Sequence, residues 1–281
     1  MKRLLFSFVI LLVAFSANCQ GFHLNLFVGT SNYQGDLQSK RFTFNQAHFA
    51  GGVGLSYIFT QHFAVRADFK IGKISGNDKY SKNIVRNLNF TSHLTEGDID
   101  LQYFLTPLGT HSLTPYVFAG LALYHFDPYT FDSTGTKYYL PPLSTEGEGF
   151  VSGTKMYSLT QIGIPFGGGI KLALSDNLNV GVEFGIRKLF TDYLDDVSKT
   201  YVDENLLLAN RGAKAVELAY RGDEVKGGSL VYPNAGAQRG NPGSKDWYYF
   251  TGFTLSFRLG NGLIGSGTGK YSDWDCPKSV L

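Results

Sequence analysis

The sequence has few cysteines and little charge. Two of its 281 residues are cysteines, and neither paired CxxC motifs nor an HExxH motif occurs, so the usual zinc-site spacings are absent. Charged residues make up 17% of the chain, with 25 basic residues against 23 acidic ones. This balance provides no basic surface for a polyanion, and we expect no nucleic-acid partner.

Long apolar runs are also lacking, apart from residues 4–15 near the amino terminus. A basic pair precedes this run and Ala17-Asn18-Cys19 follows it, which predicts a signal peptide at residues 1–19, cleaved before Gln20. The run is too short for a membrane-spanning helix. The residues before Cys19 do not fit a lipoprotein signal, so we expect ordinary cleavage, which leaves Cys276 as the last cysteine.

What the chain has instead is apolar residues at every second position. In the stretch 161–190, for example, Val180, Val182 and Phe184 alternate with glycines and a glutamate, and only β-strands place that period on one face. The pattern predicts eight strands, at residues 22–30, 49–59, 63–74, 88–105, 115–126, 158–175, 178–190 and 247–260. Several reach about ten residues, the length that a tilted strand needs to cross the hydrocarbon layer.

The connections between these strands alternate strictly between long and short. The segments 31–48, 75–87, 127–157 and 191–246 are long, whereas the other three are short turns. A soluble β-sandwich has no reason to sort its loops in this way, but outer-membrane barrels do. We therefore predict an all-β fold, an eight-stranded antiparallel transmembrane β-barrel of the outer membrane over residues 20–260. Residues 191–246 form its long extracellular loop, and both chain ends, with the tail 261–281, lie in the periplasm.

The inward face of the predicted barrel carries charges of both signs. An eight-stranded barrel is only wide enough for its own side chains or for one small ligand, and unpaired buried charges are costly. We therefore expect a lumen filled by ion pairs rather than an open pore. The residues assigned to the barrel interior are Arg66, Asp68, Lys70, Asp98, Asp100, Glu183, Arg187 and Arg258. No histidine lies in a pattern typical of a catalytic dyad, so we expect no enzymatic activity and no cofactor.

The loop 191–246 has the most distinctive local sequence. Its signature residues are Tyr193, Asp195, Asp196, Arg239, Asn241 and Pro242, with Trp247 at the start of the last strand. Its apolar residues predict a short helix within 205–220 and a folded cap over the barrel mouth; they are Leu206, Leu207, Leu208, Val216 and Leu218. Clustered aspartates such as Asp192, Asp195 and Asp203 suit either calcium or backbone capping, and the spacing favours capping.

The segments 193–198, 201–203 and 238–242, and the strand from Asp246-Trp247-Tyr248 to Gly260, resemble the PorG-like family of small outer-membrane barrels. The resemblance extends over nearly the whole mature chain in organisation. It implies a non-enzymatic subunit of the type IX secretion system, or a paralogue of one. Its implied role is to anchor periplasmic ring components that resemble PorK and PorN, with outer-membrane lipids around the barrel.

The tail at residues 261–281 is glycine-rich before it reaches Trp274, Cys276 and Pro277. A glycine-rich segment is a flexible tether, and the sequence after it suggests a periplasmic docking peptide. In an oxidising compartment Cys276 is either idle or paired with another chain, so an intermolecular disulfide is one expectation. The alternative function is a surface-exposed binding barrel whose long loops hold an unknown ligand.

Overall fold

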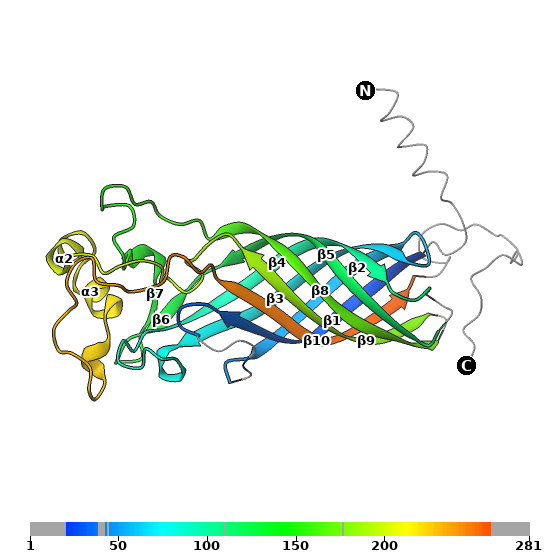
Figure 1. Cartoon of the computed structure of the whole chain (residues 1–281), viewed down its shortest axis with the longest axis horizontal. Coiled ribbons are helices and arrows are strands. Elements are labelled where there is room, and N and C mark those ends of the chain that lie inside the picture. Colours follow the sequence, from blue (N-terminus) through cyan, green and yellow to red (C-terminus); the bar gives the residue numbers. More distant parts are fainter. Residues whose placement is uncertain (1–20, 39–42, 44, 109–110, 176, 260–281) are drawn as a thin grey trace, which may run out of the picture.

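The computed structural model describes residues 21–38, 43, 45–108, 111–175 and 177–259 (Figure 1). Eight long strands build its wall. They are β1 (Gly21–Gln34), β2 (His48–Ile58), β3 (Phe63–Asn77), β4 (Asn89–Phe104), β5 (Leu113–Phe126), β8 (Thr160–Ser175), β9 (Leu178–Leu189) and β10 (Trp247–Arg258). All neighbouring pairs are antiparallel. The predicted strands are therefore confirmed, with bounds shifted by only a few residues.

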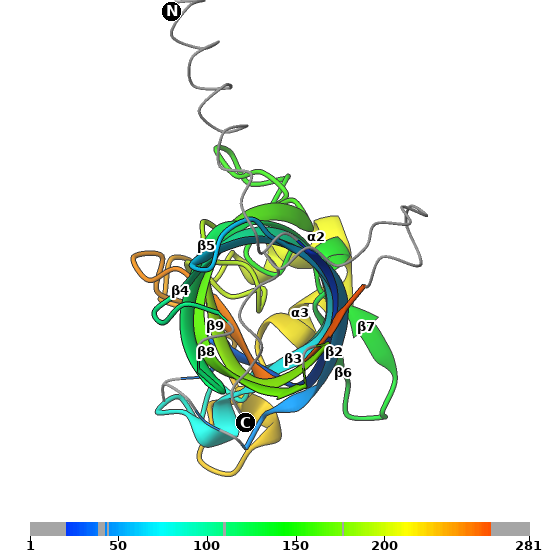
Figure 2. The ribbon, with the colours of Figure 1, turned by 90° about the vertical axis from the view of Figure 1, so that its right-hand side faces the viewer.

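The sheet closes on itself into a barrel. β1 pairs with β2 on one side and with β10 on the other, where the register runs from His23 opposite Arg258 to Gln34 opposite Trp247. β3 also pairs with β4, so the eight long strands form a continuous ring. Figure 2 looks along this ring from the end that carries the short turns. The predicted eight-stranded antiparallel barrel is confirmed.

The four long connections lie at one end of the barrel, here called the loop end, and the tight connections lie at the short-turn end (Figure 1). The loop end carries two strands that the sequence did not predict, β6 (Tyr129–Phe131) and β7 (Lys137–Tyr139), which pair with each other, while β6 also touches β4. Three one-turn 3-10 helices lie there too, η1 (Asp78–Tyr80), η2 (Pro141–Leu143) and η3 (Gly222–Glu224).

The helix predicted in the loop 191–246 is present as two short helices, α2 (Glu204–Arg211) and α3 (Ala213–Ala219). Asp203 caps α2 by accepting a hydrogen bond from the backbone N–H of Leu206, and Gly212 separates the helices at a φ of 85°, which favours glycine. Neither these helices nor any other helix in the described ranges is long and apolar enough to cross a membrane.

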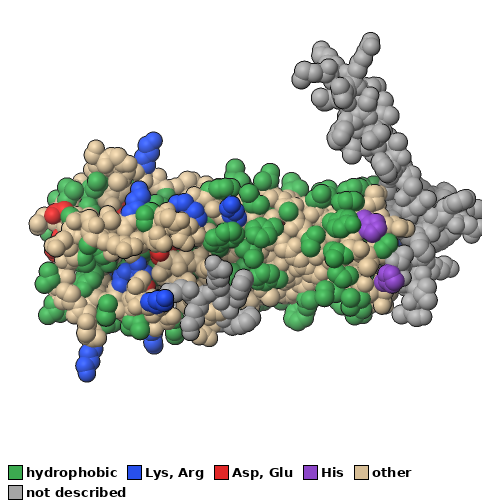
Figure 3. Space-filling model, viewed as in Figure 1, with side chains coloured by type: hydrophobic (Ala, Val, Ile, Leu, Met, Phe, Trp, Pro, Cys, Tyr) green, Lys and Arg blue, Asp and Glu red, His purple; other side chains and the backbone are tan. Residues whose placement is uncertain are grey.

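The outer wall of the barrel is apolar. Side chains that alternate outward along the strands are exposed aliphatic and aromatic residues, among them Phe69, Ile99, Leu121, Ile162 and Phe253. Figure 3 shows this apolar belt on the barrel wall, whereas the charged side chains visible in the view gather at the loop end. Exposed apolar surface on this scale is stable only in contact with lipid, so the barrel has the surface of a membrane-spanning protein.

Candidate functional site

The lumen holds a network of buried ion pairs. Near its middle, Arg66 binds Asp100 at 2.8 Å through Nη2 and Glu183 at 2.6 Å through Nη1. The hydroxyl of Tyr116 donates a further hydrogen bond of 2.6 Å to Glu183. β3, β4, β5 and β9 place these four side chains, so the network ties together strands on opposite sides of the barrel.

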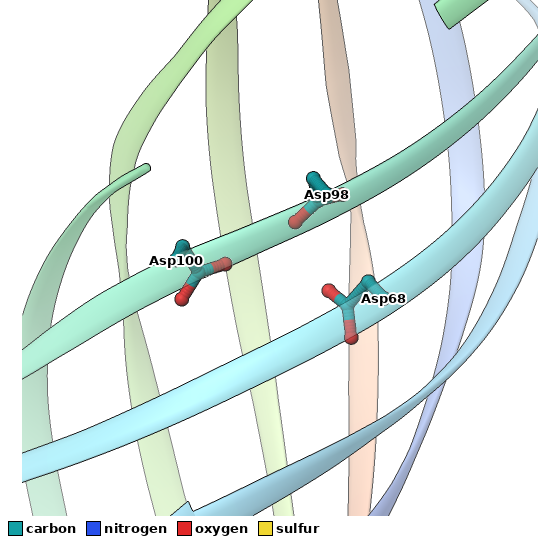
Figure 4. A group of neighbouring side chains, drawn as sticks. All are labelled: Asp68, Asp98 and Asp100. Carbon is teal, nitrogen blue, oxygen red and sulfur yellow. The ribbon is translucent and has the colours of Figure 1, made fainter. Parts of the chain in front are cut away.

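Three aspartates come close together in this network. Asp98 and Asp100 project from β4 and Asp68 from the neighbouring β3, toward a common space (Figure 4). Their oxygens lie within 4.8 Å of one another, a spacing that suits a metal ion. The cluster already contains two cations, because the Lys70 ammonium lies 2.5 Å from Asp68 and 2.9 Å from Asp98, and Arg66 binds Asp100. Each of the three carboxylates is therefore in contact with a cation of the chain itself.

A second ion pair lies nearer the loop end. Arg187 on β9 donates two hydrogen bonds to Glu96 on β4, at 2.9 Å from Nε and 2.6 Å from Nη2. The Tyr248 hydroxyl on β10 also donates to Glu96, at 2.5 Å. A forked pair of this kind is the strongest type of ion pair and fixes the distance between its strands. Sequence reasoning missed Glu96, although it lies two residues before Asp98 and so shares its inward face.

Lys171 is the other interior charge that sequence reasoning left out of its set. It lies on β8, is buried, and donates a hydrogen bond of 3.0 Å to Gln102. Its ammonium also lies 5.0 Å from the ring centre of Phe104 and 4.9 Å from that of Tyr116. The alternation along β8 indicates its direction, because Lys171 lies between the outward Ile170 and Leu172.

Arg258 corrects the predicted interior set. The other seven residues of that set have side chains in the lumen, whereas Arg258 is exposed at the short-turn end. It is the last residue of β10, so the wall ends before its side chain is enclosed. Arg258 is at an inward-facing position in the alternation of β10. The alternation does not show how far along the barrel the enclosing wall extends.

Apolar clusters lie on both sides of the charged network. On the short-turn side Ile58, Ala64, Phe104, Tyr116 and Phe118 pack together, with Leu108 against them. On the loop side, inward residues of the strands pack with residues of the loops in one larger cluster that includes Tyr33, Phe90, Phe126, Leu189, Leu194, Val197 and Phe250. The lumen is thus filled by side chains along its length.

The long loops fold into a cap with Arg239 at its centre. Arg239 is buried; its Nη1 donates to Glu146 at 3.0 Å and to the Asp196 carbonyl at 2.6 Å, and its Nε donates to the Ala219 carbonyl at 3.2 Å. Glu146 in turn accepts hydrogen bonds from the backbone N–H groups of Ser198 and Lys199. Arg239 therefore joins the connection between β5 and β8 to both halves of the loop 191–246.

The predicted loop signature serves the cap's own structure. Asp195 accepts hydrogen bonds from the backbone N–H of Val197, at 3.0 Å, and from the hydroxyl of Tyr33. Asp196 accepts from the hydroxyls of Thr145 at 2.6 Å and Tyr157 at 2.7 Å. Asp195 thus has the backbone-capping role that the sequence favoured over calcium, whereas the partners of Asp196 are side-chain hydroxyls.

The rest of the signature is more scattered. The ring of Tyr193 stacks on Tyr157 with centroids 4.9 Å apart, and Asn241 and Pro242 are exposed. Trp247 belongs to β10 and packs edge-on to Phe166, with 6.3 Å between the ring centroids.

Among the predicted cap residues Leu207 and Leu218 are buried and Val216 is half-buried, but Leu206 and Leu208 are exposed. Trp274, Cys276 and Pro277 lie outside the described residues.

Several buried cap carboxyls, among them Asp192 and Asp246, form no ion pair with any residue in the part of the chain that the structure describes. Burial raises the pKa of Asp192 to about 7, although Ser198 donates a hydrogen bond to it. Burial also raises the pKa of Asp246 well above its usual range, and the nearby carboxyls of Asp195 and Asp192 add to the effect. The folded cap therefore favours the protonated form of these carboxyls more than the unfolded chain does.

This arrangement predicts a cap that loosens as the pH rises. A carboxyl whose pKa is raised by folding stabilises the folded cap fully below about pH 4, the pKa that it has in the unfolded chain. This stabilisation is lost as the pH rises through the higher pKa of the folded state. We expect amide protection factors of residues 191–246, normalised to unfolded-chain rates, to fall between pH 5 and pH 8. Asp192→Asn should flatten this dependence, whereas Asp223→Asn, at an exposed aspartate of the same loop, should not. Amide protection factors that rise with pH would contradict the expected direction of this change.

A groove opens on the surface of the cap. It has a volume of about 620 Å³ and lies between the segments 82–86, 227–229 and 238–241, with Asp36, Tyr201 and Tyr220 also in its wall. The hydroxyl of Tyr220 holds one side by donating to the Ser229 carbonyl at 2.9 Å. The volume is within the range of about 300–1,000 Å³ typical of ligand sites.

The closed wall, the apolar belt and the filled lumen together define an outer-membrane β-barrel. The chain belongs to the family described as a domain of unknown function, DUF6089, whose model matches residues 2–211. No curated protein matches the sequence. The predicted resemblance to the PorG-like family is finer than this family assignment and stays a prediction.

Solved structures of small outer-membrane barrels are similar in fold. Neisserial surface protein A has 10% identity and a TM-score of 0.43, with 85% of this chain and 97% of that chain covered. Ail, the attachment invasion locus protein of Yersinia pestis, has 7% identity and a TM-score of 0.42, with 86% and 99% covered. OprG from Pseudomonas aeruginosa has 11% identity and a TM-score of 0.37, with 86% and 98% covered. This likeness concerns the barrel alone and carries no argument about ligands or partners.

Proposed function

We propose that this chain is a non-enzymatic structural subunit of the outer membrane that does not conduct solutes. The observation that carries the proposal is the lumen, which is filled by the ion pairs of Arg66, Lys70 and Arg187 and flanked by apolar clusters on both sides. Opening a path would separate several buried charges from their partners, at a cost of several kcal/mol for each pair. Such a barrel acts through its two ends rather than through its interior.

The finer form of this proposal is a ring anchor. The PorG-like resemblance of the segments 193–198 and 238–242 supports attachment of periplasmic ring proteins that resemble PorK and PorN. Gly21, at the start of β1, and Arg258, at the end of β10, both lie at the short-turn end, so a tail that continues past β10 starts on that side. In this proposal the short-turn end faces the periplasm, and residues 261–281, with Trp274 and Cys276, carry the docking contact.

Deletion of residues 261–281 tests the ring anchor. We expect the shortened barrel to insert and fold normally but to lose ring lipoproteins that co-purify with the full chain in mild detergent. Non-reducing gels of the full chain and of Cys276→Ser show whether an intermolecular disulfide contributes. Retention of the same ring proteins after the deletion would overturn the anchor function. It would not affect the proposal that the barrel does not conduct solutes.

A second candidate function is binding at the loop end. The observation that favours it is the open groove on the folded cap, whose walls are held in place by buried contacts such as that between Arg239 and Glu146. A preformed groove on a rigid cap is typical of a binding surface. This function does not depend on the tail, so the two candidates are separable by experiment.

A further inference from the structure

The groove on the cap has exposed amide groups that the protein leaves unused. Among the described residues, the Asn83 side chain has no hydrogen-bond partner, and Gln238 and Asn241 each use only one end of their amides, on Gly240 and Gly243. All three amide side chains are exposed. Each amide offers both a donor and an acceptor, which matches a ligand that presents N–H and C=O groups in alternation.

The arginines in the groove wall, by contrast, are already occupied. Arg86 binds Asp78 at 2.7 Å through both Nε and Nη2, and its Nη1 donates to the backbone carbonyl of Arg239. Arg239 is bound to Glu146. Lys82 and Asp36 add one charge of each sign to the same wall, so these two charges balance. Because the guanidinium groups are held by the protein's own acceptors, the groove is not built to select an anion.

Exposed aliphatic residues lie in, or next in sequence to, two of the segments that form the groove. On the connection between β3 and β4, Ile84 is 57% exposed and Val85, which lines the groove, is 56% exposed. Directly after the lining segment 227–229, Leu230 is 86% exposed and Val231 is 74% exposed. Exposed aliphatic residues in and beside groove-lining segments are typical of a protein-interaction site, whereas a saccharide has little use for them.

We propose that this groove is a docking site for an extended, uncharged segment of a partner protein. The amides of Asn83, Gln238 and Asn241 bind the segment's backbone, and the aliphatic flanks receive its apolar side chains. The inference deepens the loop-end binding function proposed above and is independent of the ring anchor. It rests on the groove alone and needs no residue of the tail.

A peptide library tests the docking site. Detergent-solubilised full-length barrel is panned against a random library of nine-residue peptides, and enriched peptides are then titrated with the wild type and with variants. We expect uncharged sequences with alternating apolar residues. Their affinity should fall roughly tenfold or more, about 1.4 kcal/mol, in Val85→Lys. Asn83→Ala should weaken binding as well. Leu208→Lys, which introduces the same charge at an exposed aliphatic residue of α2 outside the groove, should leave binding unchanged.

Neutral oligosaccharides titrated in parallel decide between ligand classes. Saturable binding of a sugar that Val85→Lys or Asn83→Ala weakens, without peptide enrichment, would overturn the proposal and assign the groove to a saccharide. Enriched peptides that bind the variants as well as they bind the wild type would also overturn it, as would the absence of any enrichment. Normal thermal unfolding of each variant shows that the loss lies in the groove. None of these outcomes bears on the tail deletion.

Discussion

Replacing Arg187 with methionine is expected to lower the free energy of unfolding by about 3–5 kcal/mol. Arg187 is buried and holds Glu96 through two short hydrogen bonds, so its loss leaves a carboxylate in the closed lumen without its cation. The Tyr248 hydroxyl still donates to Glu96, but one neutral donor does not replace a charge. Urea unfolding in detergent micelles, followed by heat-modifiable gel mobility, measures the change.

The control for this prediction removes the stranded charge. In the double variant Arg187→Met, Glu96→Gln, the amide oxygen still accepts from Tyr248, while no ionised group remains unpaired. We expect this variant to recover more than half of the lost free energy, because breaking a buried pair costs more than replacing it. Equal instability of the single and double variants would show that packing around Arg187, and not the charge, sets the cost.

Replacing Arg239 with methionine is expected to unfold the cap while the barrel stays closed. The change removes donors from Glu146 and from the carbonyls of Asp196 and Ala219, and it leaves Glu146 buried without its cation. We expect a loss of about 3–5 kcal/mol, confined to the cap. Limited proteolysis should then cut within residues 191–246 at least tenfold faster.

Lys245→Met is the matched control for Arg239→Met. Lys245 is a cation of the same loop, but it is exposed. It donates a hydrogen bond of 3.3 Å to the Pro242 carbonyl and acts on Asp192 through its charge alone. We expect no change in the rate of cleavage. Similar sensitivity in the two variants would mean that the positive charge of the loop matters rather than the buried contacts of Arg239.

The barrel was predictable because its signal is local. An alternation of apolar and polar residues over ten positions marks a strand and assigns each residue to a face, and this placed Asp98, Asp100 and Glu183 in the lumen. The same rule applies to Glu96 and Lys171, which face the same side of their strands as the inward residues two positions away. Arg258 shows the limit of this rule, because the alternation does not show where the enclosing wall ends.

The pairing of side chains was not predictable in the same way. Arg187 and Glu96 are 91 positions apart in the sequence, and they meet only because the stagger of eight strands brings β9 and β4 to the same height. The cap is a similar case. The pattern of the loop 191–246 indicated a helix and a folded cap, but the central place of Arg239 depends on contacts with Glu146, from a different loop.

Single-channel recording in planar bilayers tests the central claim most directly, namely that the barrel is closed and acts through its two ends. Purified full-length protein is inserted beside a general porin as the positive control. Because side chains fill the lumen along its length, we expect insertion without stepwise current at any voltage that the bilayer withstands. Reproducible current steps that scale with the salt concentration would contradict the closed lumen and identify the chain as a channel.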